Sequence, residues 1–295
     1  MNLSLSRSFP IAKAALAAAV IACVVALTCS LAGCASGGTG SSSADADNTS
    51  ASTDGKTLRV AMELAYPPFE TKDDAGNPEG LAVDFIRDFG AAYGYDVQIE
   101  NTAWDGLIPS LQSDKADLVI SSMTITDERK QSVDFSDAYA MAQLAILANA
   151  DSGVASIDDL NQPGKKVAVK TGSTGDVYAT KNLTNAEIVR LADESACVTE
   201  VVQGKADGFL YDQLTIYRNH QANPDTTEAV FIPCQDAEEW GIAVKKGDTE
   251  LLDQLNAFIA QSKTDGEFDR LTEKYLADEK KAFDQYGFKW FFDFE

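Results

Sequence analysis

The sequence contains a single histidine, His220, among 295 residues. Without a second histidine the chain cannot build a histidine cluster around a metal ion, and His220 has no pattern of a Ser-His-Asp triad around it. The sequence also has no Walker loop and no GxGxxG motif, since Gly172-Ser173-Thr174-Gly175 lacks the lysine of a phosphate loop. His220 lies in a polar stretch where a helix runs into a turn, which favours a surface position. We therefore expect no metal site and no cofactor, and a binding protein more than a catalyst.

Positive charge is scarce as well. The chain has 24 Lys and Arg against 46 Asp and Glu, a formal net charge of −22. Binding to nucleic acid needs clustered Lys and Arg, so this balance argues against a nucleic-acid partner. It also argues against attachment to an anionic membrane through a basic patch. The hydrophobic fraction of 45% is typical of a globular protein, and the length suits one large domain or two of medium size.

Long apolar runs are absent after Leu58, and the one near the start is short. Residues 1–33 carry only two charges, Arg7 and Lys13, before an apolar run from Ala14 to about Leu27. A membrane-spanning helix needs about 20 apolar residues, whereas a basic start followed by a short apolar stretch and small residues is typical of a secretory signal. Removal of residues 1–33 would leave a mature chain with a net charge of −24.

The end of this segment, Leu31-Ala32-Gly33-Cys34, resembles the lipobox of bacterial lipoproteins. The resemblance implies that Cys34 becomes the new N-terminus and carries lipid, with palmitate among its acyl groups; an ordinary signal peptide with a chance cysteine is the alternative. Residues 35–57 contain no large apolar side chain. Such a segment cannot bury enough surface to offset its chain entropy, so we expect residues 34–57 to be a lipid anchor and flexible tether.

From Leu58 onward, short β-type runs alternate with helical patterns. The predicted strands are 58–62, 96–99, 116–120, 166–169, 187–191, 207–210, 230–232 and 241–244, and the predicted helices are 81–93, 107–111, one after 174, 198–203, 213–219 and 250–261. This alternation predicts an α/β fold with mostly parallel sheets, and its two series suggest two lobes. Ligands bind beyond the carboxyl ends of such strands, which points to residues 121–122, 170–174 and 211–212.

Several segments together carry a family resemblance. They are Tyr66-Pro67-Pro68-Phe69-Glu70, Gly80-Leu81-Ala82-Val83-Asp84, residues 104–111, 121–136, 169–174, 204–212 and 239–248. In this order, over about residues 57–278, they resemble the bacterial extracellular solute-binding proteins of family 3, the receptors of amino-acid ABC importers. The resemblance implies a two-lobed periplasmic-binding-protein fold of type II. It places lobe 1 at 58–146 plus 241–295, lobe 2 at 147–240, and the hinge crossings near 144–150 and 241–246.

The same resemblance implies the ligand-binding residues. An amino-acid carboxylate suits the guanidinium fork of Arg129, joined by the backbone N–H groups of Thr124 and Thr174. The ammonium would be held by Asp212, the Thr124 hydroxyl and the Ser122 carbonyl. The alternatives are that Arg129 is a surface residue and that Asp212 only caps the helix that follows it.

Two aromatic and two acidic residues of the first lobe complete the expected site. Tyr66 and Trp104 match the ring positions on either side of the ligand, where they suit flat or cationic side chains; they could instead be core aromatics. Glu63 and Glu70 match positions near the ligand side chain, and an acid at Glu63 would suit an amide, amine or guanidinium. In so acidic a chain, surface carboxylates are an equally good interpretation.

Two further features have no function assigned by the resemblance. Cys197 and Cys234 remain in the mature chain, and an exported protein could join them in a disulfide; two free thiols are the alternative. The tail beyond residue 278 contains seven aromatics among its last thirteen residues. We expect it to pack on a lobe as a strap, with docking of a partner or a loosely ordered end as alternatives.

The resemblance implies a monomeric, exported and lipid-anchored protein that binds a free L-amino acid, polar or cationic, and delivers it to an ABC permease. An enzyme of the same fold, such as a cyclohexadienyl-type dehydratase, is one rival function. A sensory ligand-binding module is another. It would normally be fused to a membrane-crossing segment, and no apolar run after Leu58 approaches that length.

Overall fold

The structure of the chain, a computed structural model, describes residues 55–231, 235–286 and 289–293. All of them belong to one compact unit, residues 52–295. The predictions about the signal peptide, the lipidation of Cys34 and the tether fall outside the described residues. Within the described part, no helix has both the length and the apolar character needed to cross a membrane.

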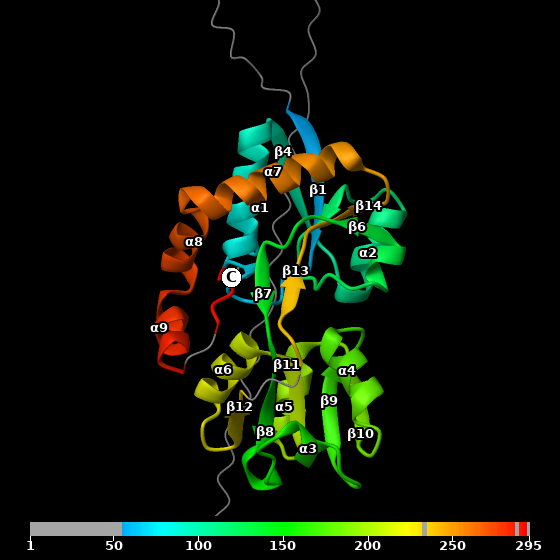
Figure 1. The fold of residues 1–295 in the computed structure, drawn as a ribbon, viewed down its shortest axis with the longest axis vertical. Helices are drawn as coiled ribbons and strands as arrows, with labels where there is room; N and C mark the ends of the chain where they lie inside the picture. Colours follow the sequence, from blue (N-terminus) through cyan, green and yellow to red (C-terminus); the bar gives the residue numbers. More distant parts are fainter. Residues whose placement is uncertain (1–54, 232–234, 287–288, 294–295) are drawn as a thin grey trace, which may run out of the picture. The chain divides into compact units, whose positions relative to one another are not determined.

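The first lobe is built on a five-stranded sheet (Figure 1). In spatial order its strands are β4 (Tyr95–Asn101), β1 (Lys56–Met62), β5 (Leu118–Val119), β14 (Ala243–Lys245) and β6 (Val133–Phe135). Its helices are α1 (Leu81–Tyr93), α2 (Leu107–Gln112), α7 (Thr249–Asp265), α8 (Glu267–Tyr275) and α9 (Ala277–Tyr286), with 3-10 turns η1 (Trp104–Gly106) and η2 (Arg129–Gln131). A small hairpin pairs β2 (Thr71–Lys72) with β3 (Pro78–Glu79). Strands β4, β1 and β5 are parallel, and β14 runs antiparallel to β5.

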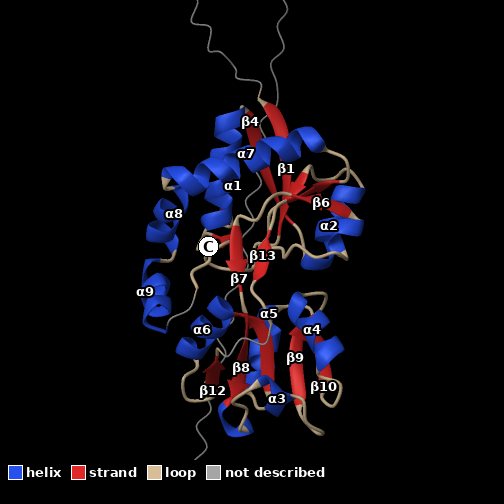
Figure 2. Ribbon diagram, viewed as in Figure 1, coloured by secondary structure: helices blue, strands red, loops and turns tan. Residues whose placement is uncertain are grey.

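The second lobe repeats the scheme around another five-stranded sheet (Figure 2). Its strands are β10 (Glu187–Leu191), β9 (Lys166–Lys170), β11 (Gly208–Asp212), β8 (Leu144–Asn149) and β12 (Thr227–Val230). Its helices are α3 (Ile157–Leu160), α4 (Thr174–Asn182), α5 (Glu194–Val202) and α6 (Gln213–Ala222), with the 3-10 turn η3 (Ala150–Ser152). Strands β10, β9 and β11 are parallel, whereas β8 is antiparallel to β11 and β12. The two-lobed α/β prediction is confirmed.

Two short strands connect the lobes. β7 (Ala140–Ala142) pairs with β13 (Glu238–Trp240) in an antiparallel ladder that belongs to neither main sheet. The sequence places these crossings a few residues later, at 144–150 and 241–246, and that prediction is wrong: β8 already belongs to the second sheet and β14 to the first. The reason is that the run 140–148 is apolar except for Gln143 and every residue in it is buried or half-buried, so hydrophobicity alone does not separate the crossing strand β7 from β8.

Helix α1 shows how closely a strong pattern can locate an element. Val83, Phe85, Ile86 and Phe89 are all buried at helical spacing, as expected. The helix ends because Gly94 adopts a left-handed conformation, with a φ of 73°, which closes the C-terminus. The predicted bounds 81–93 are confirmed, although Tyr93, expected on the buried face, is 38% exposed.

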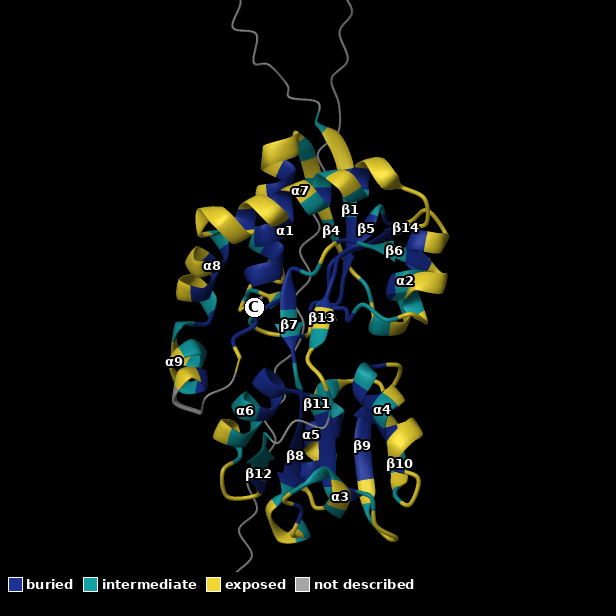
Figure 3. Ribbon diagram, viewed as in Figure 1, coloured by how far each residue is buried: buried dark blue, intermediate teal, exposed yellow. Residues whose placement is uncertain are grey.

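In the second lobe, β8 is buried on both faces. Leu144 and Ile146 pack in a cluster with Val167 and Val169 of β9, while Leu147 packs on the opposite face in a cluster with Phe209 and the helix residues Val201 and Ile216. Side chains alternate between the two faces of a strand, so a strand with helices packed on both faces needs apolar residues at successive positions. Figure 3 shows these central strands buried and the outer helices exposed.

The ends of four strands determine where polar groups gather. β1 is followed by Glu63, β5 by the stretch Ser121-Ser122, and β9 by the turn 171–173, while β11 itself ends in Asp212. All four of these strands run parallel to a neighbour, and their carboxyl ends point toward the crossing strands (Figure 1).

Candidate functional site

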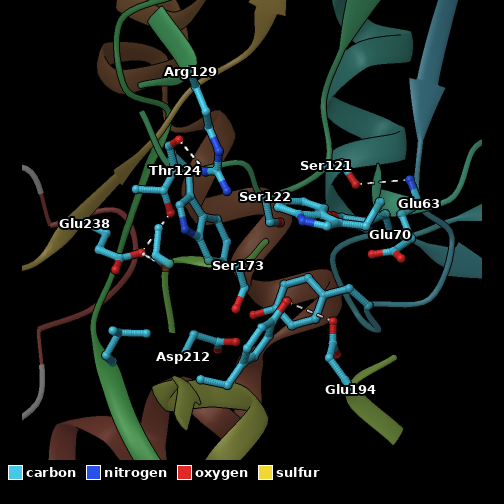
Figure 4. A pocket seen from close by; sticks show the side chains of 16 residues that line it. Glu63, Glu70, Ser121, Ser122, Thr124, Arg129, Ser173, Glu194, Asp212 and Glu238 are labelled. Atoms are coloured by element: carbon cyan, nitrogen blue, oxygen red, sulfur yellow. Dashed lines mark hydrogen bonds between the residues drawn. The ribbon is translucent and has the colours of Figure 1, made fainter. Parts of the chain in front are cut away.

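The polar strand ends line a pocket between the two sheets (Figure 4). Its lining is Glu63, Tyr66, Glu70, Trp104, Ser121, Ser122, Thr124, Arg129, Leu144, Ser173, Thr174, Glu194, Tyr211, Asp212, Glu238 and Trp240. All eight ligand-binding residues expected from the sequence are in this set. The segments that supply them are separated by up to 149 residues along the chain, from Glu63 to Asp212, yet the fold brings their side chains to one place.

One end of the pocket is formed around Arg129. The guanidinium donates from Nη1 to the Thr124 carbonyl at 2.7 Å and from Nη2 to the Gly172 carbonyl at 3.2 Å. It also lies over the Trp104 ring, 5.3 Å from the centroid. Burial lowers the pKa of Arg129, and the nearby Glu238 opposes this; the group keeps its charge because a guanidinium is always protonated in proteins. We call this end the guanidinium end.

Glu238, which the sequence did not single out, occupies the same end. Its Oε2 accepts hydrogen bonds from the hydroxyls of Thr124 at 2.8 Å and Thr174 at 2.7 Å. Its Oε1 accepts from Gln235 at 2.6 Å. Burial raises the pKa of Glu238, while the two threonine hydroxyls lower it. A carboxylate of the chain therefore sits on the hydroxyls of the two threonines whose backbone N–H groups were expected to receive the carboxylate of a ligand.

Asp212 lines the pocket and also caps helix α6. Its Oδ1 accepts from the backbone N–H groups of Leu214 at 2.9 Å and Thr215 at 3.1 Å, and its Oδ2 accepts from the Thr215 hydroxyl at 2.8 Å. Burial raises the pKa of Asp212, and the bonds from Thr215 oppose this. Asp212 therefore caps α6, one of the two roles expected from the sequence, and it also lines the pocket.

The opposite end of the pocket contains a buried cation among carboxylates, and we call it the acidic end. The Lys170 ammonium forms ion pairs with Glu63 and Glu194, the latter at 3.2 Å. Only 2% of the Lys170 side chain is exposed, and its nitrogen lies 5.0 Å from the centroid of the Trp104 ring. Burial alone would lower the pKa of Lys170, but Glu194 and Glu63 together raise it above its usual value.

Two further carboxyls at the acidic end have perturbed pKa values. Burial raises the pKa of Glu194 to about 7, against the opposing charge of Lys170 and a hydrogen bond from the Tyr211 hydroxyl at 2.9 Å. Burial raises the pKa of Glu70 well above its usual value. Both oxygens of Glu70 are buried without a hydrogen-bond partner in the described part, as is the hydroxyl of Ser122. Burial therefore favours the neutral form of the Glu70 carboxyl.

Aromatic rings form the walls between the two ends. Tyr66 is buried and stacks on Phe69, with ring centroids 5.5 Å apart, and it meets Trp240 edge to face at 6.0 Å. Trp104 is half-buried and lies close to both cations, Arg129 and Lys170. Ser122, at the end of β5, has a positive φ of 48°, a strained backbone for a serine of the kind that clusters at functional sites.

The sequence reasoning gave no ligand role to Glu194, Tyr211 and Glu238 of the pocket lining, or to Lys170, which is paired with Glu63 and Glu194 beside it. Lys170 and Tyr211 lie in segments that the strand-end rule pointed to, so attention to their side chains would have found them. Glu194 begins a helix that the sequence places four residues late, and Glu238 lies on a crossing strand that the sequence places elsewhere.

Two other candidate residues lie apart from the lining of the pocket. His220 is near the end of α6, with its Nδ1 3.1 Å from the Thr227 carbonyl. Cys197 is buried, and its expected disulfide to Cys234 stays a prediction because Cys234 lies outside the described residues. Cys197 packs with Val201 and Phe209 in an apolar cluster, and burial raises its pKa to about 12. Among the described residues no cluster of His, Cys, Asp and Glu is suited to a metal ion.

Comparisons with known proteins agree with this geometry. The model of the bacterial extracellular solute-binding proteins, family 3, matches residues 58–278. A "probable histidine-binding protein" of Neisseria gonorrhoeae is 37% identical over 258 residues, which cover 86% of this chain and 94% of that protein. An L-arginine-binding protein of Pseudomonas aeruginosa is 34% identical over 253 residues, covering 79% of this chain and 90% of that protein.

A solved structure gives a similar result. The crystal structure of AncCDT-1, an ancestral amino acid-binding protein described as a precursor of cyclohexadienyl dehydratase, superposes with a TM-score of 0.68. It is 38% identical in sequence and covers 74% of this chain and 94% of that chain. Similarity of this extent supports the type II periplasmic-binding fold, and the family match spans both sheets, the crossing strands and the entire lining of the pocket. The chain belongs to family 3 of the bacterial extracellular solute-binding proteins.

Proposed function

We propose that this protein captures a free L-amino acid with a polar or cationic side chain between its lobes and delivers it to the permease of an ABC importer. The observation that carries the proposal is the division of charge in the pocket, with Arg129 at one end and Glu63, Glu70 and Glu194 at the other. A zwitterion with a donor on its side chain matches this division. The curated relatives, named as binding proteins for histidine and arginine, support it.

At the guanidinium end the ligand carboxylate takes the place that Glu238 occupies. It accepts hydrogen bonds from Arg129 and from the N–H groups of Thr124 and Thr174, and Glu238 moves aside because two carboxylates this close repel each other. The ligand ammonium lies against Asp212, the Thr124 hydroxyl and the Ser122 carbonyl. Asp212 can serve in this way while it caps α6, because a carboxylate offers about four lone-pair sites.

At the acidic end the ligand side chain meets Glu63, Glu194 and Lys170. A guanidinium, imidazole or amide can donate to the two carboxylates. Tyr66 and Trp104 enclose its apolar or flat portion from the sides, where stacking and cation–π contact suit such groups. The ammonium of Lys170 competes with a cationic ligand for the same carboxylates, so the length of the side chain and its charge together determine the affinity.

The binding energy needed for closure is within reach of these contacts. A ligand bound with micromolar affinity gains about 8 kcal/mol. Hydrogen bonds to charged groups contribute about 1.5–3 kcal/mol each, so a handful around Arg129 and Asp212 is sufficient. Because the ligand contacts both lobes, it binds the closed arrangement better than an open one and shifts the population toward closure. The permease then recognises the closed form.

We infer further that the mature protein begins at Cys34 and is held by lipid on the outer face of the cell membrane, as a monomer. The lipobox-like end of the signal and the tether support this anchor. We also infer that the chain is not an enzyme: its curated relatives are binding proteins, and its one histidine is remote from the pocket lining. Recovery of the ligand unchanged after long incubation tests that inference.

A thermal-shift screen of the mature chain against the twenty amino acids tests the function. Bound ligand raises the melting temperature by mass action, and a flat result with all twenty would contradict the proposal. Asp212→Asn sharpens the test, because asparagine caps a helix as well as aspartate does. We expect this variant to keep the wild-type melting temperature without ligand and to show no rise in melting temperature when ligand is added. A rise as large as that of the wild type would mean that Asp212 caps α6 and does not bind the ligand.

A further inference from the structure

The C-terminal segment lies outside the part of the chain that matches the family, and yet it is buried. Phe283, Trp290 and Phe291 are each at most 3% exposed, and all three belong to the main core cluster of the first lobe. Phe292 stacks on Phe268 with ring centroids 4.6 Å apart. Of the two alternatives for this aromatic tail, the packed strap is the one that fits its described residues, 277–286 and 289–293.

Phe291 contacts both strands that cross between the lobes. Its carbonyl accepts a hydrogen bond of 2.7 Å from the N–H of Met141 in β7. Its ring lies 5.4 Å from the ring of Trp240 in β13, measured between centroids. Hinge motion in two-lobed proteins is absorbed by a few residues of the connecting segments. Phe291 therefore contacts both crossing strands, β7 and β13, at the hinge between the lobes.

The same residue is linked to the wall of the pocket. The Phe291 ring lies 5.2 Å from that of Phe69, which stacks on Tyr66. Tyr66 and Trp240 both line the pocket. The aromatic rings thus form a continuous packed chain from the tail to the two pocket residues, and a packed group of this kind transmits displacement because it has little free volume.

At its other end the tail reaches the second lobe. Phe283 meets Tyr217 of α6 edge to face, with ring centroids 5.9 Å apart. Glu279 of α9 lies 3.7 Å from the guanidinium of Arg218, and Arg218 also donates to the Pro67 carbonyl, beside Tyr66, at 2.5 Å. Figure 1 shows α9 descending from the first lobe toward α6. These contacts cross from one lobe to the other away from the pocket lining.

We propose that the described residues of the tail, 277–286 and 289–293, form a clamp that fixes the hinge and favours the closed arrangement of the lobes. Phe291 is the positioning residue at the crossing strands, and Phe283 and Glu279 hold α6 of the second lobe. Rotation of the second lobe away from the first would separate Tyr217 from Phe283 and Arg218 from both Pro67 and Glu279. The clamp therefore raises the fraction of closed protein before ligand arrives and slows the release of ligand afterwards.

Tyr217→Ala, which removes the second-lobe ring of the clamp, tests the proposal. Small-angle X-ray scattering of the full mature chain without ligand should show a larger radius of gyration than the wild type. With L-arginine, L-histidine and L-glutamine as probes, ligand dissociation in stopped-flow fluorescence should accelerate by about three- to tenfold, the factor that corresponds to an aromatic pair. Arg218→Ala, on a surface side chain, should give a smaller change in the same direction.

Two control variants distinguish the proposed effect on lobe closure from a general loss of stability. Tyr217→Phe keeps the ring and should restore the wild-type scattering and dissociation rate, and Gln221→Ala, an exposed position on the same helix, should change neither. An unchanged radius of gyration in both Tyr217→Ala and Arg218→Ala, with only a lower melting temperature, would overturn the proposal. The scattering measurement needs no ligand, so it decides on the clamp even if none of the three amino acids binds and the proposed function fails.

Discussion

The two ends of the pocket satisfy their charges in opposite ways. At the guanidinium end the half-buried cation, Arg129, donates from its side chain only to backbone carbonyls in the hydrogen bonds described, and the carboxylate beside it, Glu238, accepts from two neutral hydroxyls. At the acidic end the cation, Lys170, is in direct ion pairs with two carboxylates. A charge that lacks a direct counter-ion is available to a ligand, whereas a paired one must first be released.

This difference suggests how the pocket divides its tasks. The guanidinium end is poised to receive the carboxylate that every amino acid has, and so it supplies affinity. The acidic end offers its carboxylates only to a side chain that can compete with Lys170, and so it supplies discrimination. Each of the following predictions alters one end and compares the result with the other, from the largest expected effect to the smallest.

Arg129→Ala should abolish binding, with a loss of at least about a hundredfold in affinity, because the ligand carboxylate loses its charged partner. The melting temperature without ligand should change little, since the guanidinium bonds only to carbonyls that water can also reach. Titration calorimetry checks the affinity. Arg190→Ala, at a half-exposed arginine paired with Asp176, is the control, and normal affinity in Arg129→Ala would remove Arg129 from the site.

Lys170→Met should lower the free energy of unfolding by about 3 kcal/mol, because it leaves Glu63 and Glu194 buried without their cation. L-arginine should restore part of this loss by taking the place of the ammonium. The control is Lys166→Met, whose ion pair with Glu187 is solvent-exposed and contributes at most about 0.5 kcal/mol. Equal losses in the two variants, measured by urea unfolding, would contradict the proposed role of the buried pair.

Glu238→Gln should tighten ligand binding by about five- to tenfold, or about 1 kcal/mol, because the ligand no longer displaces a carboxylate from Thr124 and Thr174. Glu239→Gln, the same change at the exposed neighbouring position, should leave the affinity unchanged. Weaker binding in Glu238→Gln would mean that Glu238 holds the ligand instead of giving way to it.

Glu194→Gln should flatten the dependence of stability on pH. The pKa of Glu194 is raised to about 7 by burial, so the folded state holds this proton more tightly than the unfolded state does. The free energy of unfolding therefore falls as the pH rises from about 4.5 to about 7. Urea unfolding at several pH values should show a smaller fall in the variant, while Glu187→Gln, at an exposed carboxylate, should match the wild type; an identical slope in Glu194→Gln would refute the assignment.

The sequence was sufficient for those parts of the molecule that depend on local pattern. The buried stripe of α1 and the glycine that ends it give the helix its bounds, and the strand-end rule gives the positions of Ser122, Thr174 and Asp212. The crossing strands were misplaced because the run 140–148 is apolar at every position but Gln143, and one polar residue does not tell a crossing strand from a strand of the main sheet.

The charge pairing in the pocket could not be predicted from the sequence. Lys170 and Glu63 are 107 residues apart, and Thr124 and Glu238 are 114 residues apart. No periodicity relates residues at such separations, and in a chain with 46 acidic side chains nothing distinguishes these from the solvated ones. Their burial is a consequence of how the lobes meet, which depends on the whole fold.

A crystal structure of the mature chain with the amino acid that gives the largest thermal shift tests the central claim most directly. The account predicts that the ligand carboxylate lies on Arg129, Thr124 and Thr174, with Glu238 displaced from both threonine hydroxyls, and that the side chain points toward Glu63 and Glu194. A structure in which Glu238 still bonds to both threonines, with the ligand bound elsewhere or in the reverse direction, would contradict it.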